Sequence, residues 1–216
     1  MPLKYTLRAD GPTDAMLMPI LRWILVRALP EVELQGSFAD PRMFPPGTAR
    51  RLVPSIRSAV DLYPCDLLFV HRDAEGEDPN SRVREIAAAM EDVSRVASVR
   101  SISVIPVRMS EAWLLIDEAA LRRAAGNPNG KSPLSLPSMK NLENLPDPKA
   151  ELHSLLRAAC ELRGRRLKSF RPEDRIPLLS DLILDYSPLR KLTAFQRLTN
   201  AISEFCADYR SGKSSR

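Results

Sequence analysis

A short apolar run that leads directly into acidic residues, between residues 65 and 78, constrains the fold more than any other stretch of the chain. The run at residues 67–70 is continuous and rich in strand formers, which is typical of a strand buried on both faces of a sheet. Residues two apart in an extended strand project to the same side, so we expect Asp73 and Glu75 to point together, with His71 on that side as well. The alternative interpretation is a solvated acidic turn after a core strand.

Strand-like and helix-like stretches alternate four times in the first part of the chain. Strands are expected at residues 3–7, 32–38, 67–70 and 102–107. Helices are expected at residues 13–28 with a kink at Pro19, and at 48–62, 81–97 and 110–121. This alternation predicts an α/β fold whose mostly parallel central sheet has helices on both faces.

The remaining sequence predicts a C-terminal helical addition to this core. Prolines are frequent at residues 127–148, where we expect a long loop that is functional or mobile. The pattern is helical over residues 149–210, and Ser187 and Pro188 are expected to begin the last helix. The tail at 211–216 is expected to be disordered. The α/β core would then occupy residues 1–126.

Composition and cysteine usage exclude several classes of protein. The chain has no apolar run near the ~20 residues of a membrane span and no signal-peptide pattern at its start, so we expect a cytoplasmic protein without a membrane partner. Cys65, Cys160 and Cys206 are widely separated and predict buried, reduced thiols instead of disulfides or a zinc site. His71 and His153 are too few for a histidine-based metal site. The net charge of +5 allows an anionic partner.

Acidic residues follow three of the predicted strands: Asp10 with Asp14, Asp73 with Glu75, and Glu111. Ligands of open α/β sheets bind beyond the carboxyl ends of the strands. If the first and third strands are neighbours, Asp10, Asp73 and Glu75 meet at one edge, where a cation would relieve their repulsion. Mg²⁺ takes oxygen ligands of this kind, and such a site can orient a water against a phosphodiester. Helix capping is the alternative role for Asp10 and Asp14.

A basic segment at residues 163–171 carries five positive residues in nine. We expect the segment to contact the phosphates of nucleic acid, with an affinity that falls steeply as salt rises. The alternative is a solvated helix end whose cations interact favourably with the helix dipole. The side chains expected to make the phosphate contacts are Arg163, Arg165, Arg166 and Lys168.

Several short segments together resemble the Toprim fold, in which an acidic residue and Gly follow the first strand and Asp-x-Asp follows a later strand. They are more similar to a Toprim-like bacterial family catalogued as domain of unknown function 4276. The matching segments are Arg8–Asp14, Val70–Glu75, Ser110–Asp117, Leu145–Lys149 and Leu192–Leu198. Toprim enzymes usually carry Glu where this chain has Asp10, and Asp where it has Glu75. Each carboxylate is therefore displaced by about one methylene group, and a 1 Å misplacement can cost roughly 10²-fold in rate.

The resemblance implies a metal-dependent nuclease that hydrolyses phosphodiester bonds in DNA or RNA. Asp10, Asp73 and Glu75 would hold Mg²⁺ or Mn²⁺, and Glu111 would be a further ligand or a water-orienting base. Such families often occur beside ATPases in phage-defence loci, so the resemblance also implies an ATPase partner encoded nearby and an antiviral role.

Two other functions are compatible with the sequence. The first is a catalytically inactive Toprim-like module that binds an ATPase partner or nucleic acid. The second is a small-molecule nucleotide-binding protein, although the chain has no Gly-rich loop of the kind that cradles phosphates. Assembly as a homo-oligomer is compatible with each of these functions.

Overall fold

The computed structural model describes residues 2–95 and 97–212 of the 216-residue chain. The chain divides into two compact units, and we describe each by itself. The sheet unit comprises Met1–Val107 and Ala194–Arg216, and the helical unit comprises Arg108–Thr193.

This division differs from the one expected from the sequence, which placed boundaries near residues 126 and 149. The last helix, α8 (Thr193–Arg210), lies almost entirely within the sheet unit. Its Phe195 ring contacts the ring of Trp23, and Arg210 donates a hydrogen bond to the carbonyl oxygen of Ala28. Of the tail expected to be disordered, residues 213–216 lie outside the described residues.

The sheet unit is built on four parallel strands, so the predicted α/β fold with a parallel central sheet is confirmed. Across the sheet the order is β2-β1-β3-β4. Every residue of β3 is buried, because this strand lies inside the sheet and is covered on both faces. The strands are β1 (Leu3–Arg8), β2 (Leu34–Ala39), β3 (Leu67–His71) and β4 (Arg100–Val104).

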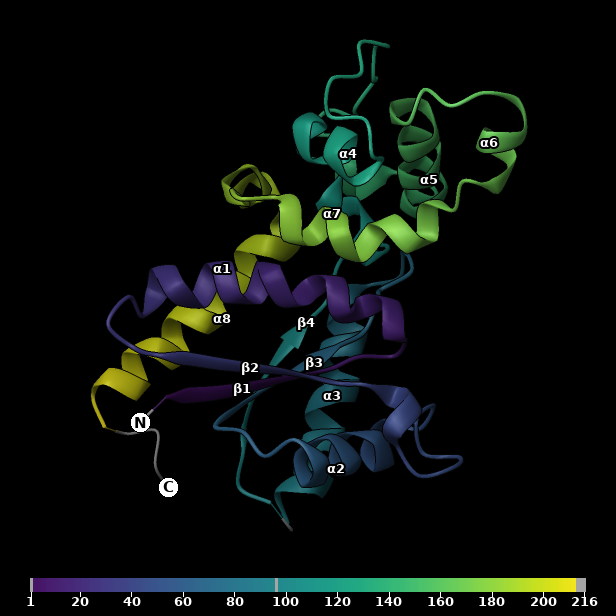
Figure 1. The fold of residues 1–216 in the computed structure, drawn as a ribbon. Coiled ribbons are helices and arrows are strands. Elements are labelled where there is room, and N and C mark those ends of the chain that lie inside the picture. Colours follow the sequence, from purple (N-terminus) through teal and green to yellow (C-terminus); the bar gives the residue numbers. More distant parts are fainter. Residues whose placement is uncertain (1, 96, 213–216) are drawn as a thin grey trace. The chain divides into compact units, whose positions relative to one another are not determined.

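Helices cover both faces of the sheet (Figure 1). On one face lie α1 (Met18–Ala28) and α8; on the other lie α2 (Leu52–Leu62) and α3 (Pro79–Ser94). Alternation along the strands supplies a core to each layer. The rings of Tyr5 and Phe69 meet edge to face on the α1 side, with centroids 6.0 Å apart. Leu68 and Val70 point the other way and join the apolar core formed with α2 and α3.

Prolines near the helix starts occupy first turns. Pro12–Leu17 forms a 3-10 helix, η1, and α1 follows directly with Pro19 in its first turn. Where a kink was expected at Pro19, the chain therefore changes from a 3-10 helix to an α-helix at Met18, one residue before the proline. Helix α2 begins at Leu52, later than the expected residue 48, with Pro54 in its first turn. The missing N–H groups cost little at these positions because first-turn N–H groups have no acceptor within the helix.

The helical unit consists of short helices. The prediction of a single helix over residues 110–121 is wrong. The Asp117 side chain accepts a hydrogen bond from the Ala120 N–H and so caps a separate helix that begins at Glu118. The 3-10 helix that begins at Ser187 is likewise separate from α8. The elements are η3 (Ser110–Leu114), α4 (Glu118–Ala124), η4 (Leu142–Asn144), α5 (Pro148–Ala159), α6 (Gly164–Ser169), η5 (Pro172–Arg175), α7 (Ile176–Leu182) and η6 (Ser187–Lys191); η2 (Pro41–Met43) belongs to the sheet unit.

Within residues 2–95 and 97–212, each helix falls short of the length and apolarity that a membrane crossing requires.

Candidate functional site

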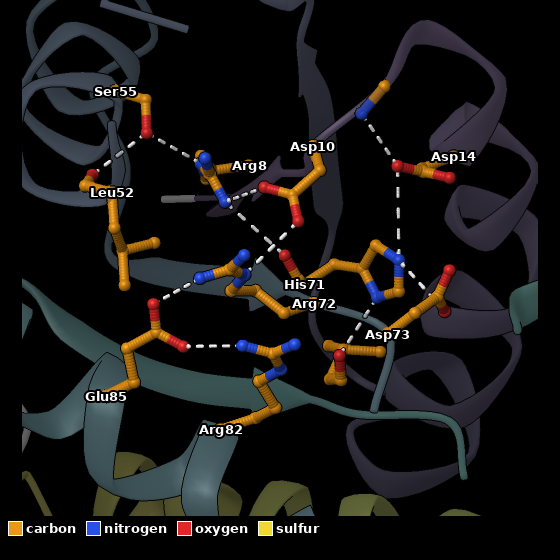
Figure 2. A network of polar contacts seen from close by, with 12 residues as sticks. Arg8, Asp10, Asp14, Leu52, Ser55, His71, Arg72, Asp73, Arg82 and Glu85 are labelled. Carbon is orange, nitrogen blue, oxygen red and sulfur yellow. Dashed lines mark hydrogen bonds and ion pairs between the residues drawn. The ribbon is translucent and has the colours of Figure 1, made fainter. Parts of the chain in front are cut away.

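The register between β1 and β3 separates the polar residues at the carboxyl end of the sheet into two groups. Arg8 is paired with Val70, and directly paired residues project to the same face. Arg8 therefore lies on the side of α2 and α3, whereas His71, one residue further along β3, lies on the side of α1. Figure 2 shows the two groups of contacts that result.

Arg8 is a buried cation on the α2 side of the sheet. Its side chain is 1% exposed; Nε donates to Ser55 Oγ at 2.9 Å and Nη1 lies 2.8 Å from Asp10 Oδ1. Burial lowers the pKa of Arg8, and the carboxylate of Asp10 acts in the opposite direction. Asp10 is thus the counter-ion of an arginine that the fold has removed from water.

A second arginine also holds Asp10. Arg72 Nε lies 3.2 Å from Asp10 Oδ2, and Arg72 forms a further ion pair with Glu85 of α3. Arg82 Nη1 lies 3.2 Å from the other carboxylate oxygen of Glu85. Negative and positive groups therefore alternate from Arg8 to Arg82, as the dashed lines in Figure 2 show. The negative charge of Asp10, expected to bind a cation, is already balanced by two guanidinium groups.

His71 organises the group on the α1 side. It is 1% exposed, and its Nδ1 lies 2.9 Å from the carbonyl oxygen of Val104. A carbonyl oxygen accepts but does not donate, so Nδ1 carries the hydrogen and Nε2 is the atom turned towards the carboxylates. Nε2 lies 3.5 Å from Asp73 Oδ1 and 3.9 Å from Asp14 Oδ2. The structure therefore places one imidazole beside two carboxylates at the end of a central strand.

Asp14 also has the capping role that was the alternative to metal binding. Its Oδ2 accepts a hydrogen bond from the Gly11 N–H at 2.9 Å, which closes the start of η1. Glu75 is exposed and has a φ of 55°, in the left-handed region. The extended backbone that would have aligned Glu75 with Asp73 ends before this turn, so strand alternation does not govern the direction of Glu75.

Glu111 belongs to the helical unit. It lies in η3, is 5% exposed, and its Oε1 lies 3.7 Å from Lys149 Nζ at the start of α5. Two of the segments that resemble the Toprim-like family, one around Glu111 and one ending at Lys149, therefore meet in this unit. An ammonium group beside a buried carboxylate offsets the cost of burying its charge.

The basic segment forms α6 and the residues on either side of it. None of the six residues of α6 is buried. The side chains that are exposed to solvent include Arg163, Arg165, Arg166 and Lys168. Arg166 and Lys168 lie in the last turn of this short helix. Exposed cations at a helix C-terminus are compatible both with binding phosphates and with the dipole interaction that was the alternative.

Sequence reasoning did not identify Arg8, Arg72 or the central position of His71. The available signal was a charged or polar residue at the last position of each central strand, where an ordinary core strand would have an apolar one. Burial of Arg8 could not be inferred from that signal, because its partner Ser55 lies 47 residues further along the chain.

Within residues 2–95 and 97–212, no three His, Cys, Asp or Glu side chains are close enough together to hold a metal ion. Comparison of the chain with protein-family models, with curated proteins and with solved structures gives no match.

Proposed function

We propose that this chain is a Toprim-like, divalent-cation-dependent nuclease that hydrolyses phosphodiester bonds in DNA or RNA. The observation that carries the proposal is the convergence of His71, Asp73 and Asp14 at the carboxyl end of the sheet (Figure 2). Ligands of open α/β sheets bind beyond this end of the strands. All three residues also lie in segments that resemble the Toprim-like family.

The donor atoms of this group suit a divalent cation. Donation from Nδ1 of His71 to a backbone carbonyl is the arrangement that orients metal-binding histidines through the other nitrogen. Asp73 and Asp14 would supply oxygen ligands, and an imidazole ligand suits Mn²⁺ better than Mg²⁺. Their oxygens, at 3.5 and 3.9 Å from Nε2, would have to turn towards it to share a cation. When bound, the cation would stabilise charge on a phosphate oxygen and activate a water molecule.

Arginines of the chain would assist by binding phosphates. The Arg72 side chain is 25% exposed and stands between Asp10 and Glu85, so a phosphate at this edge would compete with these carboxylates for its guanidinium group. In the helical unit we assign further phosphate contacts to the exposed side chains of the basic segment. An ATPase encoded nearby, as in phage-defence systems, is the proposed partner, and this part of the proposal rests on the resemblance.

A second candidate function is a module without turnover that binds an ATPase partner or nucleic acid. Two observations favour it. Both carboxylate oxygens of Asp10 are paired with guanidinium groups. Among the described residues, the side chains near His71 are not close enough together to hold a metal ion in their present positions. Such an arrangement balances its charges without a cation.

Calorimetric titration with Mn²⁺ tests the site and its ligand set. Asp73→Asn and Asp14→Asn keep the shape of the side chain and remove its charge, and His71→Gln replaces the imidazole ring with a smaller polar group. Each change should weaken Mn²⁺ binding by roughly tenfold or more. Glu75→Gln, two residues after Asp73, is the matched control and should bind as the wild type does. Unchanged binding by Asp73→Asn would exclude this site. Loss of binding in Glu75→Gln, with His71→Gln unaffected, would instead support the ligand set expected from the sequence.

Cleavage assays separate the two candidate functions. Plasmid DNA, single-stranded DNA and tRNA are incubated with Mn²⁺, with and without the ATPase encoded nearby. The nuclease predicts cleavage by the wild type that is lost in both Asp73→Asn and His71→Gln. Cleavage that persists in both variants would point to a contaminant, and retained partner binding without cleavage would favour the inactive module.

A further inference from the structure

The edge strand β4 offers an open hydrogen-bonding edge in the sheet unit. β4 stands last in the sheet order, and no strand of the described residues pairs with its outer side. The carbonyl oxygen of Val104 accepts from the Arg72 N–H and so faces β3. Backbone groups alternate in direction along a strand, which turns the N–H and C=O groups of Ser101 and Ser103 outward. An edge of this kind is a template for pairing with another chain.

A groove of about 320 Å³ runs beside this edge, between residues of α3 and α8. Its lining is largely apolar and includes Ile102 of β4, Phe205 of α8 and Val83 of α3, which is 42% exposed. Two exposed charged residues of α8, Arg197 and Glu204, also line the groove. Arg100 of β4 lines the groove as well, and its side chain is paired with Asp208 of α8. The groove therefore combines apolar walls with charges of both signs.

We propose that a second copy of this chain occupies the groove, with the two β4 strands paired antiparallel about a two-fold axis perpendicular to the sheet. The charges on α8 are complementary to those of a second copy. Arg197 and Glu204 are seven residues apart, which is about 10.5 Å along a helix. Across such an axis the two α8 helices run antiparallel, so Arg197 of each copy faces the partner's Glu204. A symmetric interface forms this ion pair twice.

Small side chains at the centre of the contact allow the two copies to approach closely. Ala201 lies near the midpoint between Arg197 and Glu204 and lines the groove. With the strand pairing centred on Ile102, Ser101 stands opposite the partner's Ser103. Two four-stranded sheets would then continue as one.

Charge-reversal variants of the full chain test the proposal. Sedimentation velocity over a series of protein concentrations measures the dissociation constant of the dimer for each variant. Arg197→Glu and Glu204→Arg each place like charges together twice per dimer, so each should raise the dimer dissociation constant by at least about tenfold. The double variant Arg197→Glu/Glu204→Arg restores both pairs and should restore the dimer. Residues two turns apart on one helix do not pair with each other, so recovery must come from the partner.

Ser203→Glu is the matched control, because Ser203 is exposed on the same helix but does not line the groove. Its hydroxyl donates a hydrogen bond to the Thr199 carbonyl oxygen within α8. This variant should dimerise as the wild type does. A wild type that stays monomeric throughout the series would overturn the proposal, and so would a double variant no better than the single ones. Hydrogen exchange of the Ser101 and Ser103 amides should slow as the dimer forms; unchanged exchange in a proven dimer would overturn the strand pairing.

Discussion

Arg8 Nη1 lies 2.8 Å from Asp10 Oδ1, and the pair joins a side chain that is 1% exposed to one that is 45% exposed. This asymmetry predicts unequal costs for removing the two partners. Asp10→Asn leaves a buried guanidinium without its nearest counter-ion and should lower the free energy of unfolding by roughly 3 kcal/mol. Arg8→Met keeps the bulk and leaves Asp10 with solvent and Arg72, so it should cost less, roughly 1 to 2 kcal/mol.

Urea denaturation of the two variants measures this difference. Equal costs, or a greater cost for Arg8→Met, would contradict the predicted asymmetry, and an Asp10→Asn variant as stable as the wild type would show that Asp10 does not stabilise the buried cation. The result also bears on metal titrations, since a loss of Mn²⁺ binding in Asp10→Asn has meaning only at temperatures where that variant is folded.

A close contact between neighbouring strands predicts the effect of a single methyl group. Gly36 of β2 is paired with Tyr5 of β1, and a Cβ added at Gly36 would stand 2.4 Å from Cζ of the Tyr5 ring. Gly36→Ala should therefore destabilise the protein by about 1 to 3 kcal/mol through overpacking. At Gly11 the nearest atom would be 3.6 Å away, so Gly11→Ala is the control and should have a much smaller effect on the unfolding midpoint. Equal midpoints for the two variants would contradict the packing described here.

The helical unit contains a carboxylate whose contribution to stability depends on pH. The Ser132 N–H donates to Glu161 Oε1 at 2.7 Å, and this bond holds the pKa of Glu161 below its ordinary value of 4.5. Because the folded-state pKa is depressed, the stabilisation is present above pH 4.5 and is lost as the pH falls through the folded value.

Glu161→Gln should therefore be less stable than the wild type at neutral pH, and the difference should shrink as the pH falls below 4.5. Thermal unfolding of both proteins over this pH range gives the comparison. A difference that stays constant with pH would assign the effect of the substitution to something other than the charge of Glu161.

Salt dependence distinguishes the two interpretations of the basic segment. If Arg165 and Arg166 contact phosphates, replacing both with Gln should flatten the plot of log affinity against log salt by roughly 1.4 to 1.8 units. A solvated helix instead predicts little change in affinity. It also predicts little change in stability, because Arg166 lies in the last turn of α6 and Arg165 in its first turn, where the helix dipole acts on a cation in the opposite sense. Arg50→Gln/Arg51→Gln removes the same charge from another exposed pair and should leave the slope unchanged. Equal slopes for all three proteins would remove nucleic-acid binding from this segment.

The fold class followed from local patterns in the sequence. The apolar run before Asp73 predicted a buried strand, and β3 is buried along its whole length. The alternation of strands and helices predicted a parallel sheet with helices on both faces, which the structure has. These features depend on side-chain periodicity within single elements, and that periodicity is visible in the sequence.

The grouping of the polar residues was decided by tertiary structure. We expected Asp10 and Asp73 to meet at one edge; instead Asp10 pairs with Arg8 and Arg72, whereas Asp73 lies beside His71. Periodicity within a strand shows which of its residues share a face, but the register between β1 and β3 is set by the packing of segments about sixty residues apart. A shift of one residue in that register would exchange the faces, and no local feature of the sequence specifies it.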